Sequence, residues 1–224
     1  MEEFVAFETV VYKASVKSIK EGKVDKEILK TLDVVCDKYI EEAKKIAQES
    51  LDKRYEKFGK EVGDKGSTYH STNELIDDIQ FQVFNKFVLK TAENILDSQG
   101  FDLTNHKLKY TEMWVQEFTR AGGGHHDTHI HWNNHISGFY FLKCSDKTAQ
   151  PIFHDPRPGK MMTQLPEKKE ELITYASSKM VLKPKPGDLI MFNSYLPHQF
   201  PFDLGVESFR FIHFNIQAIP TQLR

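Results

Sequence analysis

Histidines are concentrated in one short segment of this chain. Five of the ten histidines lie between Gly122 and His135, and a further one, His198, stands alone far downstream. Imidazole nitrogens are common protein ligands of iron, zinc and copper. Residues two positions apart on an extended strand point to the same side, so His129 and His131 can bind one metal ion. With His198 as a distant third ligand, this spacing predicts a metal centre with open coordination positions.

A second set of ligands is available in the same segment. His125 and Asp127 also stand two positions apart, and they fit the pattern of a site with two histidines and one carboxylate. His125 directly follows three glycines, whose flexible backbone is a poor support for a ligand. We therefore favour His129, His131 and His198, and keep His125, Asp127 and His198 as the alternative.

The elements that precede the histidine segment are mainly helical. Residues 4–12 are β-branched and aromatic, which is typical of an opening strand. Apolar residues then recur at intervals of three and four over residues 26–58, which predicts a long helix. A second helix is expected from the Ser-x-x-Glu capping pattern at Ser71 to Gly100, after a glycine-rich loop at residues 63–67.

From about residue 107 the pattern changes to strands. Alternating or apolar runs predict strands at residues 109–118, 136–142, 152–154, 180–182, 188–193 and 209–218, with His198 in the loop after the fifth of these. This order predicts an α+β fold: a double-stranded β-helix, a cupin-like jelly-roll, with the N-terminal helices packed on one sheet. We expect a single domain over 1–224, in which residues 1–106 form a mainly helical support and residues 107–219 the catalytic core.

Composition excludes several classes of partner. Lys and Arg number 30 against 32 Asp and Glu, for a net charge of −2, so neither nucleic acid nor an anionic membrane is an expected partner. The two cysteines fall in a helical pattern and after a strand, which argues against a disulfide framework. The first residues resemble no signal peptide. We therefore expect a cytoplasmic protein, or one of the host cytoplasm if the chain is viral; the sequence does not indicate its oligomeric state.

The C-terminal half resembles a known family. The motifs are, in order, His129-Ile130-His131, Ser137-Gly138-Phe139-Tyr140, Asp155-Pro156-Arg157, Pro186-Gly187-Asp188, His198, and Arg210 ahead of His213-Phe214-Asn215. In this order they resemble the 2-oxoglutarate and Fe(II)-dependent oxygenases, and specifically the prolyl-hydroxylase-like branch of bacteria and phages. The resemblance spans residues 107–219. In that branch the His-x-His element stands at this distance from Ser-Gly, which also favours His129 and His131.

The resemblance implies an activity and a set of cofactors. The chain is expected to bind Fe(II), to use 2-oxoglutarate and O₂, and to hydroxylate a C–H bond of a protein, a peptide (prolyl among them) or a small molecule. The matching arginine of the family holds the distal carboxylate of 2-oxoglutarate, a task that suits a planar guanidinium. The resemblance thus implies a catalytic set of His129, His131, His198 and Arg210. Tyr140, Ser194 and Asn215 are candidate further donors to the cosubstrate.

Two functions of other classes stay open. A cupin-type metal dioxygenase or isomerase would bind its substrate directly on the three histidines without 2-oxoglutarate, and would leave Arg210 without a purpose. A non-catalytic metal-binding interaction protein would use its apolar helices as an interface. Trp132, beside the metal strand, is expected either to line the pocket or to lie in the core.

Overall fold

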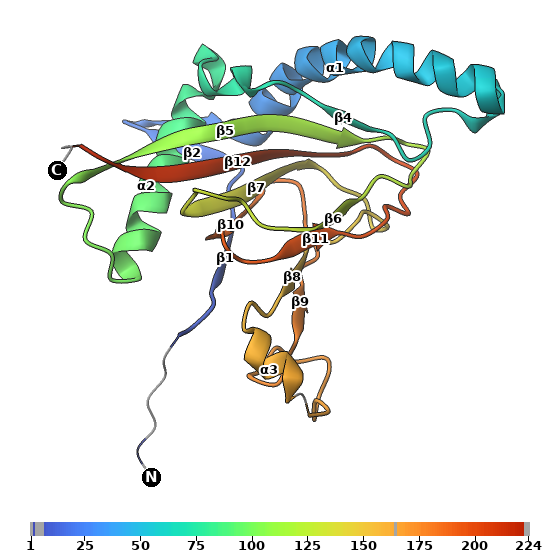
Figure 1. Cartoon of the computed structure of the whole chain (residues 1–224). Helices are drawn as coiled ribbons and strands as arrows, with labels where there is room; N and C mark the ends of the chain where they lie inside the picture. The colour runs from blue at the N-terminus through green and yellow to red at the C-terminus, as the bar shows by residue number, and fades with distance from the viewer. Residues whose placement is uncertain (1, 3–6, 164, 222–224) are drawn as a thin grey trace.

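The chain folds into a layer of helices and two antiparallel sheets (Figure 1). The computed structural model describes residues 2, 7–163 and 165–221 of the 224-residue chain. Residues 4–6 of the expected opening strand lie outside the described residues. The described part of that region is extended only from Val11, where the first strand begins.

The larger sheet has six strands in the order β1-β10-β7-β12-β5-β4, all antiparallel to their neighbours. Its two edge strands come from the N-terminal half of the chain, which is therefore more than a helical support. The pairing of β12 with β5 is the longest in the sheet and carries one register shift. The strands are β1 (Val11–Ser15), β4 (Thr68–His70), β5 (His106–Phe118), β7 (Ile136–Lys143), β10 (Asp188–Asn193) and β12 (Phe209–Pro220).

The smaller sheet has four short strands in the order β6-β11-β8-β9. It consists of β6 (His126–His129), β8 (Ile152–His154), β9 (Lys179–Val181) and β11 (His198–Phe200). The sequence did not predict β6 and β11, and the expectation that His198 lies in a loop is wrong, since it begins β11 and is fully buried. A separate hairpin joins β2 (Ser18–Glu21) to β3 (Val24–Glu27).

Helices α1 (Ile28–Phe58) and α2 (Gln82–Ser98) follow the predicted patterns, and a short helix, α3 (Pro158–Met162), lies within the segment between β8 and β9. The predicted start of the second helix is wrong. Residues Asn73–Ile76 and Ile79–Phe81 form separate 3₁₀ turns. The Ser71 hydroxyl accepts from the backbone N–H of Val115 in β5 instead of capping a helix, and Asp78 starts a new turn by accepting from the N–H of Gln80.

The two faces of the large sheet are buried by different partners. One face packs against α1 and α2, with Ile212, Phe214 and Ile216 of β12 in that core. The other face packs against the small sheet through a cluster rich in phenylalanine. Along β12 the side chains alternate between these cores, because successive strand residues point to opposite faces. The cluster between the sheets contains Phe118, Phe139, Phe141, Phe153, Phe192, Phe200, Phe209 and Phe211.

Other expectations can be compared directly. The strands at 152–154 and 188–193 have the predicted bounds, and the remaining four predicted strands differ by a few residues at most. Cys36 and Cys144 are both free. No helix in the part of the chain that the structure describes combines the length and apolar character needed to cross a membrane.

Candidate metal centre

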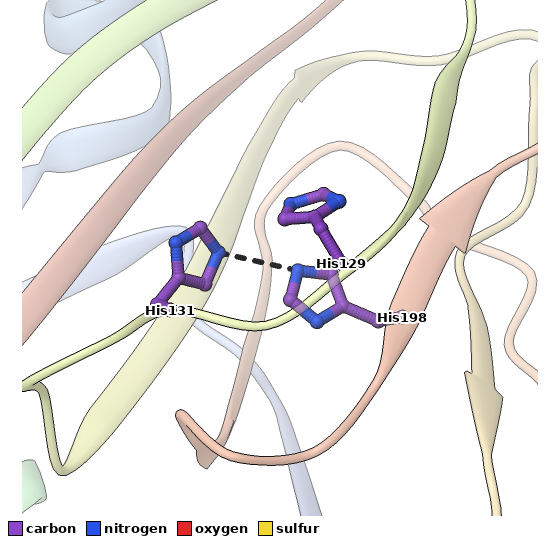
Figure 2. A group of neighbouring side chains, drawn as sticks. All are labelled: His129, His131 and His198. Atoms are coloured by element: carbon purple, nitrogen blue, oxygen red, sulfur yellow. Dashed lines mark hydrogen bonds between the residues drawn. The ribbon is translucent and has the colours of Figure 1, made fainter.

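Three histidines from two neighbouring strands of the small sheet converge (Figure 2). His129 ends β6, His131 follows it after one residue, and His198 begins β11. Since β6 and β11 are antiparallel and place His198 opposite His129, the distant histidine is brought to the pair by sheet register. One ring nitrogen from each residue lies within 4.8 Å of the others, a spacing that a single ion can bridge.

The backbone fixes two of the imidazole rings in a form suited to metal binding. Nδ1 of His129 lies 2.7 Å from the carbonyl oxygen of Asp127, and Nδ1 of His198 lies 2.9 Å from that of Leu196. A carbonyl only accepts, so each Nδ1 carries the proton and each Nε2 keeps a free lone pair. His131 is oriented through the Asn215 amide, 3.1 Å from its Nδ1, while its Nε2 lies 3.3 Å from Nε2 of His198.

Burial lowers the pKa of two of these histidines, His131 and His198. It lowers the pKa of His131 to about 4, with the neighbouring histidines His129 and His126 adding repulsion. It lowers the pKa of His198 to about 3, against a smaller opposing effect of the hydrogen bond to Leu196. Neutral imidazole is the form that binds a metal ion, so His131 and His198 are in the metal-binding form near neutral pH. The donor set fits iron(II), for which imidazole is a suitable ligand.

The structure does not bring the alternative ligand set together. His125 and Asp127 are exposed, and the His125 ring packs 4.4 Å from the ring of Phe202. Among the described residues the group that can hold a metal contains three histidines and no carboxylate. The His-x-Asp alternative is therefore corrected: Asp127 contributes its backbone carbonyl to His129 rather than its carboxylate to the metal.

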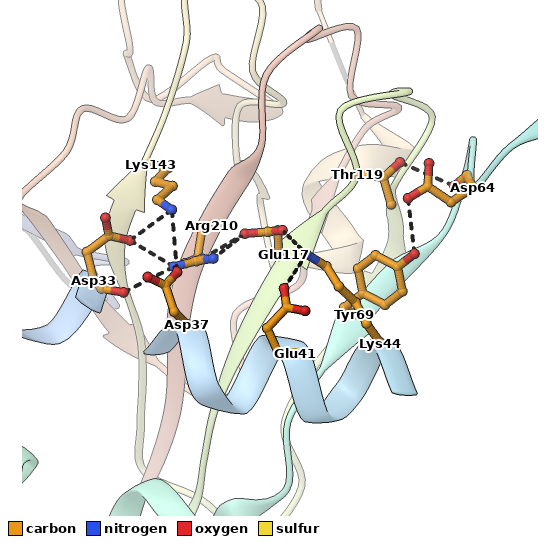
Figure 3. A network of polar contacts seen from close by, with 10 residues as sticks. All are labelled: Asp33, Asp37, Glu41, Lys44, Asp64, Tyr69, Glu117, Thr119, Lys143 and Arg210. Atoms are coloured by element: carbon orange, nitrogen blue, oxygen red, sulfur yellow. Dashed lines mark hydrogen bonds and ion pairs between the residues drawn. The ribbon is translucent and has the colours of Figure 1, made fainter. Parts of the chain in front are cut away.

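Arg210 is not at this site, contrary to the expectation from sequence (Figure 3). Its neighbours Phe209 and Phe211 face the small sheet, so Arg210 faces α1 on the opposite side. Its Nη2 lies 2.6 Å from Glu117 Oε2, and its Nη1 lies 2.7 Å from Asp37 Oδ1. The side chain is only 4% exposed, so the guanidinium is buried within this cluster of ion pairs. The geometry therefore gives no support to its assignment as the cosubstrate's partner.

Of the other three candidate donors, one lies away from the histidines and two lie close to them. Tyr140 lies in the helix-side core, where its hydroxyl donates to the carbonyl of Val16, so it is not at the site either. Ser194 and Asn215 are close to the histidines: both are fully buried and both contact the hydroxyl of Ser137. Trp132 is 81% exposed, which excludes the core role.

Sequence reasoning missed a group of polar side chains beside the histidines. Trp114 and Gln116 of β5, His126 of β6 and His213 of β12 line a cavity of about 10 Å³ together with His129, His131, Phe139, Phe200 and Phe211. Nε1 of Trp114, Oε1 of Gln116 and Nε2 of His213 are buried without a hydrogen-bond partner in the described structure. Burial also holds the pKa of His213 well below its usual value. The signal in the sequence was the polar alternation at positions 112, 114 and 116 of β5.

Comparison with known proteins agrees with the sequence resemblance. Residues 112–213 match a family model described as "Putative 2OG-Fe(II) oxygenase". This segment, a little under half of the chain, runs from β5 into β12 and contains all three histidines. No curated protein matches the sequence.

Two solved structures share the fold at low sequence identity, and a third aligns over part of the chain. A prolyl-4-hydroxylase from Pseudomonas putida aligns with a TM-score of 0.53 and 10% identity, over 93% of this chain and 92% of that one. AviO1 from Streptomyces viridochromogenes Tue57 aligns with a TM-score of 0.53 and 12% identity, over 96% and 92%. A 2OG-Fe(II) oxygenase family oxidoreductase from Burkholderia pseudomallei aligns with a TM-score of 0.41 and 8% identity, over 67% of this chain and 60% of that protein, less than two thirds of its length.

The family's cofactors are the two that its description names, iron(II) and 2-oxoglutarate. The three histidines that converge within the matched segment suit the first. Residues 112–213 are thus similar to the 2-oxoglutarate and Fe(II)-dependent oxygenases, and the whole chain shares the fold of the Pseudomonas putida prolyl-4-hydroxylase and of AviO1.

Proposed function

We propose that His129, His131 and His198 bind iron(II), and that the protein hydroxylates a C–H bond of its substrate at the expense of O₂ and 2-oxoglutarate. The observation that carries this proposal is the convergence of three ligand nitrogens within 4.8 Å inside the family segment. In the reaction 2-oxoglutarate becomes succinate and CO₂; one oxygen atom of O₂ enters succinate and the other the substrate. The metal supplies the oxidising chemistry, and the protein supplies ligation, orientation and exclusion of water.

The wall around the histidines suits oxidative chemistry. The His198 ring packs against Phe139, Phe153 and Phe192, with ring centroids 5.7, 6.1 and 4.7 Å away. A wall of this kind excludes water and strengthens electrostatic contacts at the metal.

The arrangement of the two sheets is the basis for our further proposal that they form a double-stranded β-helix, as the sequence predicts.

The substrate class is proposed as a peptide, with a small molecule as the alternative. A cleft of about 650 Å³ is lined by residues of 7–11, 155–157 and 173–180, together with Phe153 and Leu196. Phe153 connects this cleft to the metal centre, since its ring also contacts the His198 ring. The similar fold of a protein named a prolyl-4-hydroxylase favours peptidyl proline as the first substrate to test.

Metal binding and turnover test the proposal together. Iron(II) stoichiometry of His129→Ala and His131→Ala, measured anaerobically, should fall strongly, and succinate formation should be lost with it. His125→Ala is the matched control, because that exposed side chain contacts Phe202 rather than the other ligands. Full iron stoichiometry in both of the first two variants would refute the site.

One observation favours a second candidate. Among the described residues the only buried cationic side chain is Arg210, and it faces α1. A cupin-type dioxygenase that binds its substrate directly on three histidines would need no cation inside the barrel. The test is 2-oxoglutarate binding to the iron-loaded protein: its absence, with iron binding intact, would favour this candidate.

A further inference from the structure

The segment between β8 and β9, residues 155–178, forms an arm that projects from the two sheets together with α3 (Figure 1). Its two ends are tied to each other, since the backbone N–H of Asp155 donates to the carbonyl of Ser178. The Asp155 carboxylate also holds Arg157 and Lys160, at 2.8 and 3.0 Å. These contacts fix the base of the arm, so the wall that it gives to the cleft of about 650 Å³ is already formed.

Large apolar side chains are exposed around this cleft. In the arm, Ile173 is 61% and Tyr175 is 80% exposed, and in the wall formed by residues 7–11, Phe7 is 93% exposed. Single exposed apolar residues are common, but a group of them around one concave surface is typical of a binding site. Because burying such side chains is favourable, the cleft suits a partner that brings apolar side chains of its own.

A free sheet edge borders the same cleft. Within the described ranges β9 pairs only with β8, so β9 ends the small sheet. On either side of β9, the carbonyl of Ser178 and the N–H of Leu182 bond to the chain that flanks β8. Alternate residues make such bonds in an antiparallel ladder, so the N–H and C=O groups of Lys179 and Val181 point away from β8. An edge of this kind can pair with one further strand.

We infer that this edge docks an extended segment of a protein substrate, which pairs with the backbone of Lys179 and Val181 and places its apolar side chains in the cleft. This docking rests on the proposed function and describes how the peptide substrate of that function is held. Proline fits at alternate positions of the docked segment, where the missing N–H belongs to the side that faces away from β9.

The docked segment lies away from the metal centre. His198, Phe153 and Met180 lie opposite one another across β11, β8 and β9. A strand added beside Met180 is three strand spacings from His198, or roughly 14 Å. The reacting residue is therefore at least about four residues from the docked ones, because each extended residue spans about 3.3 Å. Such a site selects proteins and longer peptides over small molecules.

The test uses a fluorescein-labelled hexapeptide in which threonine and valine alternate, and its binding to the metal-free protein is followed by fluorescence anisotropy. Two analogues carry N-methyl groups on all the valines or on all the threonines. One edge of a strand carries the amides of alternate residues only. One analogue should therefore lose binding, and the other should keep it.

Val181→Pro removes the N–H at the free edge and keeps the pairing with β8, and an edge strand tolerates proline at such a position. It should weaken binding of the hexapeptide by about tenfold or more, because the added strand loses a donor and meets the proline ring. Val181→Thr is the matched control, since it keeps the N–H and a β-branched side chain. If Val181→Pro fails to fold, Lys179→Pro replaces it, with Lys179→Thr as its control.

The results separate the docking edge from the metal site. Weaker binding by the proline variant, with loss of binding by one analogue only, supports the docking. Equal binding by the proline and threonine variants overturns it, as does the same behaviour of both analogues, or no binding to the wild-type protein at millimolar peptide. His131→Ala should bind the hexapeptide as the wild type does, because the edge is remote from the ligands. Failure of the docking therefore leaves the iron titration, which tests the proposed function, unaffected.

Discussion

Replacing Arg210 with methionine should destabilise the protein rather than weaken cosubstrate binding. Its guanidinium contacts Glu117 through two nitrogens, at 2.8 and 2.6 Å, and both side chains are at most 5% exposed. Removing one member of a buried ion pair leaves an uncompensated charge, at a cost of about 3–5 kcal/mol. Asp33 and Asp37, with side chains 29% and 58% exposed, remain hydrated and should add little.

The expected loss lies near the lower end of that range, because Lys44 remains 3.6 Å from Glu117 Oε1. Urea denaturation of Arg210→Met should therefore show a lower midpoint at an unchanged slope. In the double variant Glu117→Gln, Arg210→Met no charge is left buried, so most of the stability should return. The affinity of the folded, iron-loaded variants for 2-oxoglutarate should stay within about twofold of wild type, since the contacts that the variants lose lie outside the metal site.

A different result would refute this reasoning. If Arg210→Met has the same urea midpoint as the wild type but no longer binds 2-oxoglutarate, the guanidinium binds the cosubstrate and does not stabilise the contact with α1. The assignment implied by the sequence resemblance would then be correct. A double variant that is no more stable than the single one would show that Glu117 is not the partner that matters.

Three further predictions concern the site and its frame. Burial lowers the pKa values of His131 and His198 to about 4 and about 3, so below pH 6.5 the unfolded chain binds protons that the folded chain does not. The free energy of unfolding of the metal-free protein should therefore fall as the pH is lowered from 6.5 towards 4, by about 3 kcal/mol per pH unit for the two histidines together. Urea denaturation at several pH values measures this fall. Asp127→Ala should retain iron binding, whereas His131→Ala should lose it, in the same anaerobic titration. Gly138→Ala should lower the free energy of unfolding by about 1–3 kcal/mol, because its Cβ would meet a Phe214 ring atom at a separation no real contact allows.

The sequence predicted that His129 and His131 lie side by side through a local rule. His129 and His131 share a strand face because of the two-residue period, and that period requires only a strand to be present. This period does not predict the position of His198, because its approach to His129 depends on the pairing of β6 with β11. Both strands are short, at four and three residues, and neither has the alternating pattern by which a strand is recognised.

The failure at Arg210 has a physical cause that the sequence contained. Arg210 and Asn215 lie an odd number of positions apart, so a regular strand places them on opposite faces. Both were nevertheless assigned to one site. Asn215 contacts His131, whereas Arg210 faces α1. β12 shows register shifts next to both residues, but the alternation survives between them.

The second helix shows how tertiary contacts override a local signal. The Ser-x-x-Glu pattern predicts a helix start at Ser71, but the hydroxyl bonds to the backbone of β5 and the helix begins at Gln82. A serine hydroxyl that accepts a hydrogen bond from the backbone of a nearby strand is no longer used to cap a helix. No periodicity in the chain before Ser71 indicates that β5 will lie there.

The all-histidine ligand set and the position of Arg210 are best understood together. A divalent ion with a carboxylate ligand carries one net positive charge, and a guanidinium in the barrel supplies the second charge that a dianionic cosubstrate requires. Here the ligand group has no carboxylate and the only buried guanidinium of the described residues is paired with Glu117. The ion alone then balances the dianion. An isolated inward guanidinium would add an excess positive charge to a dry site, which is costly. Under the proposed function, an all-histidine ligand set therefore removes the electrostatic need for an inward arginine, and Arg210 instead joins the sheet to α1.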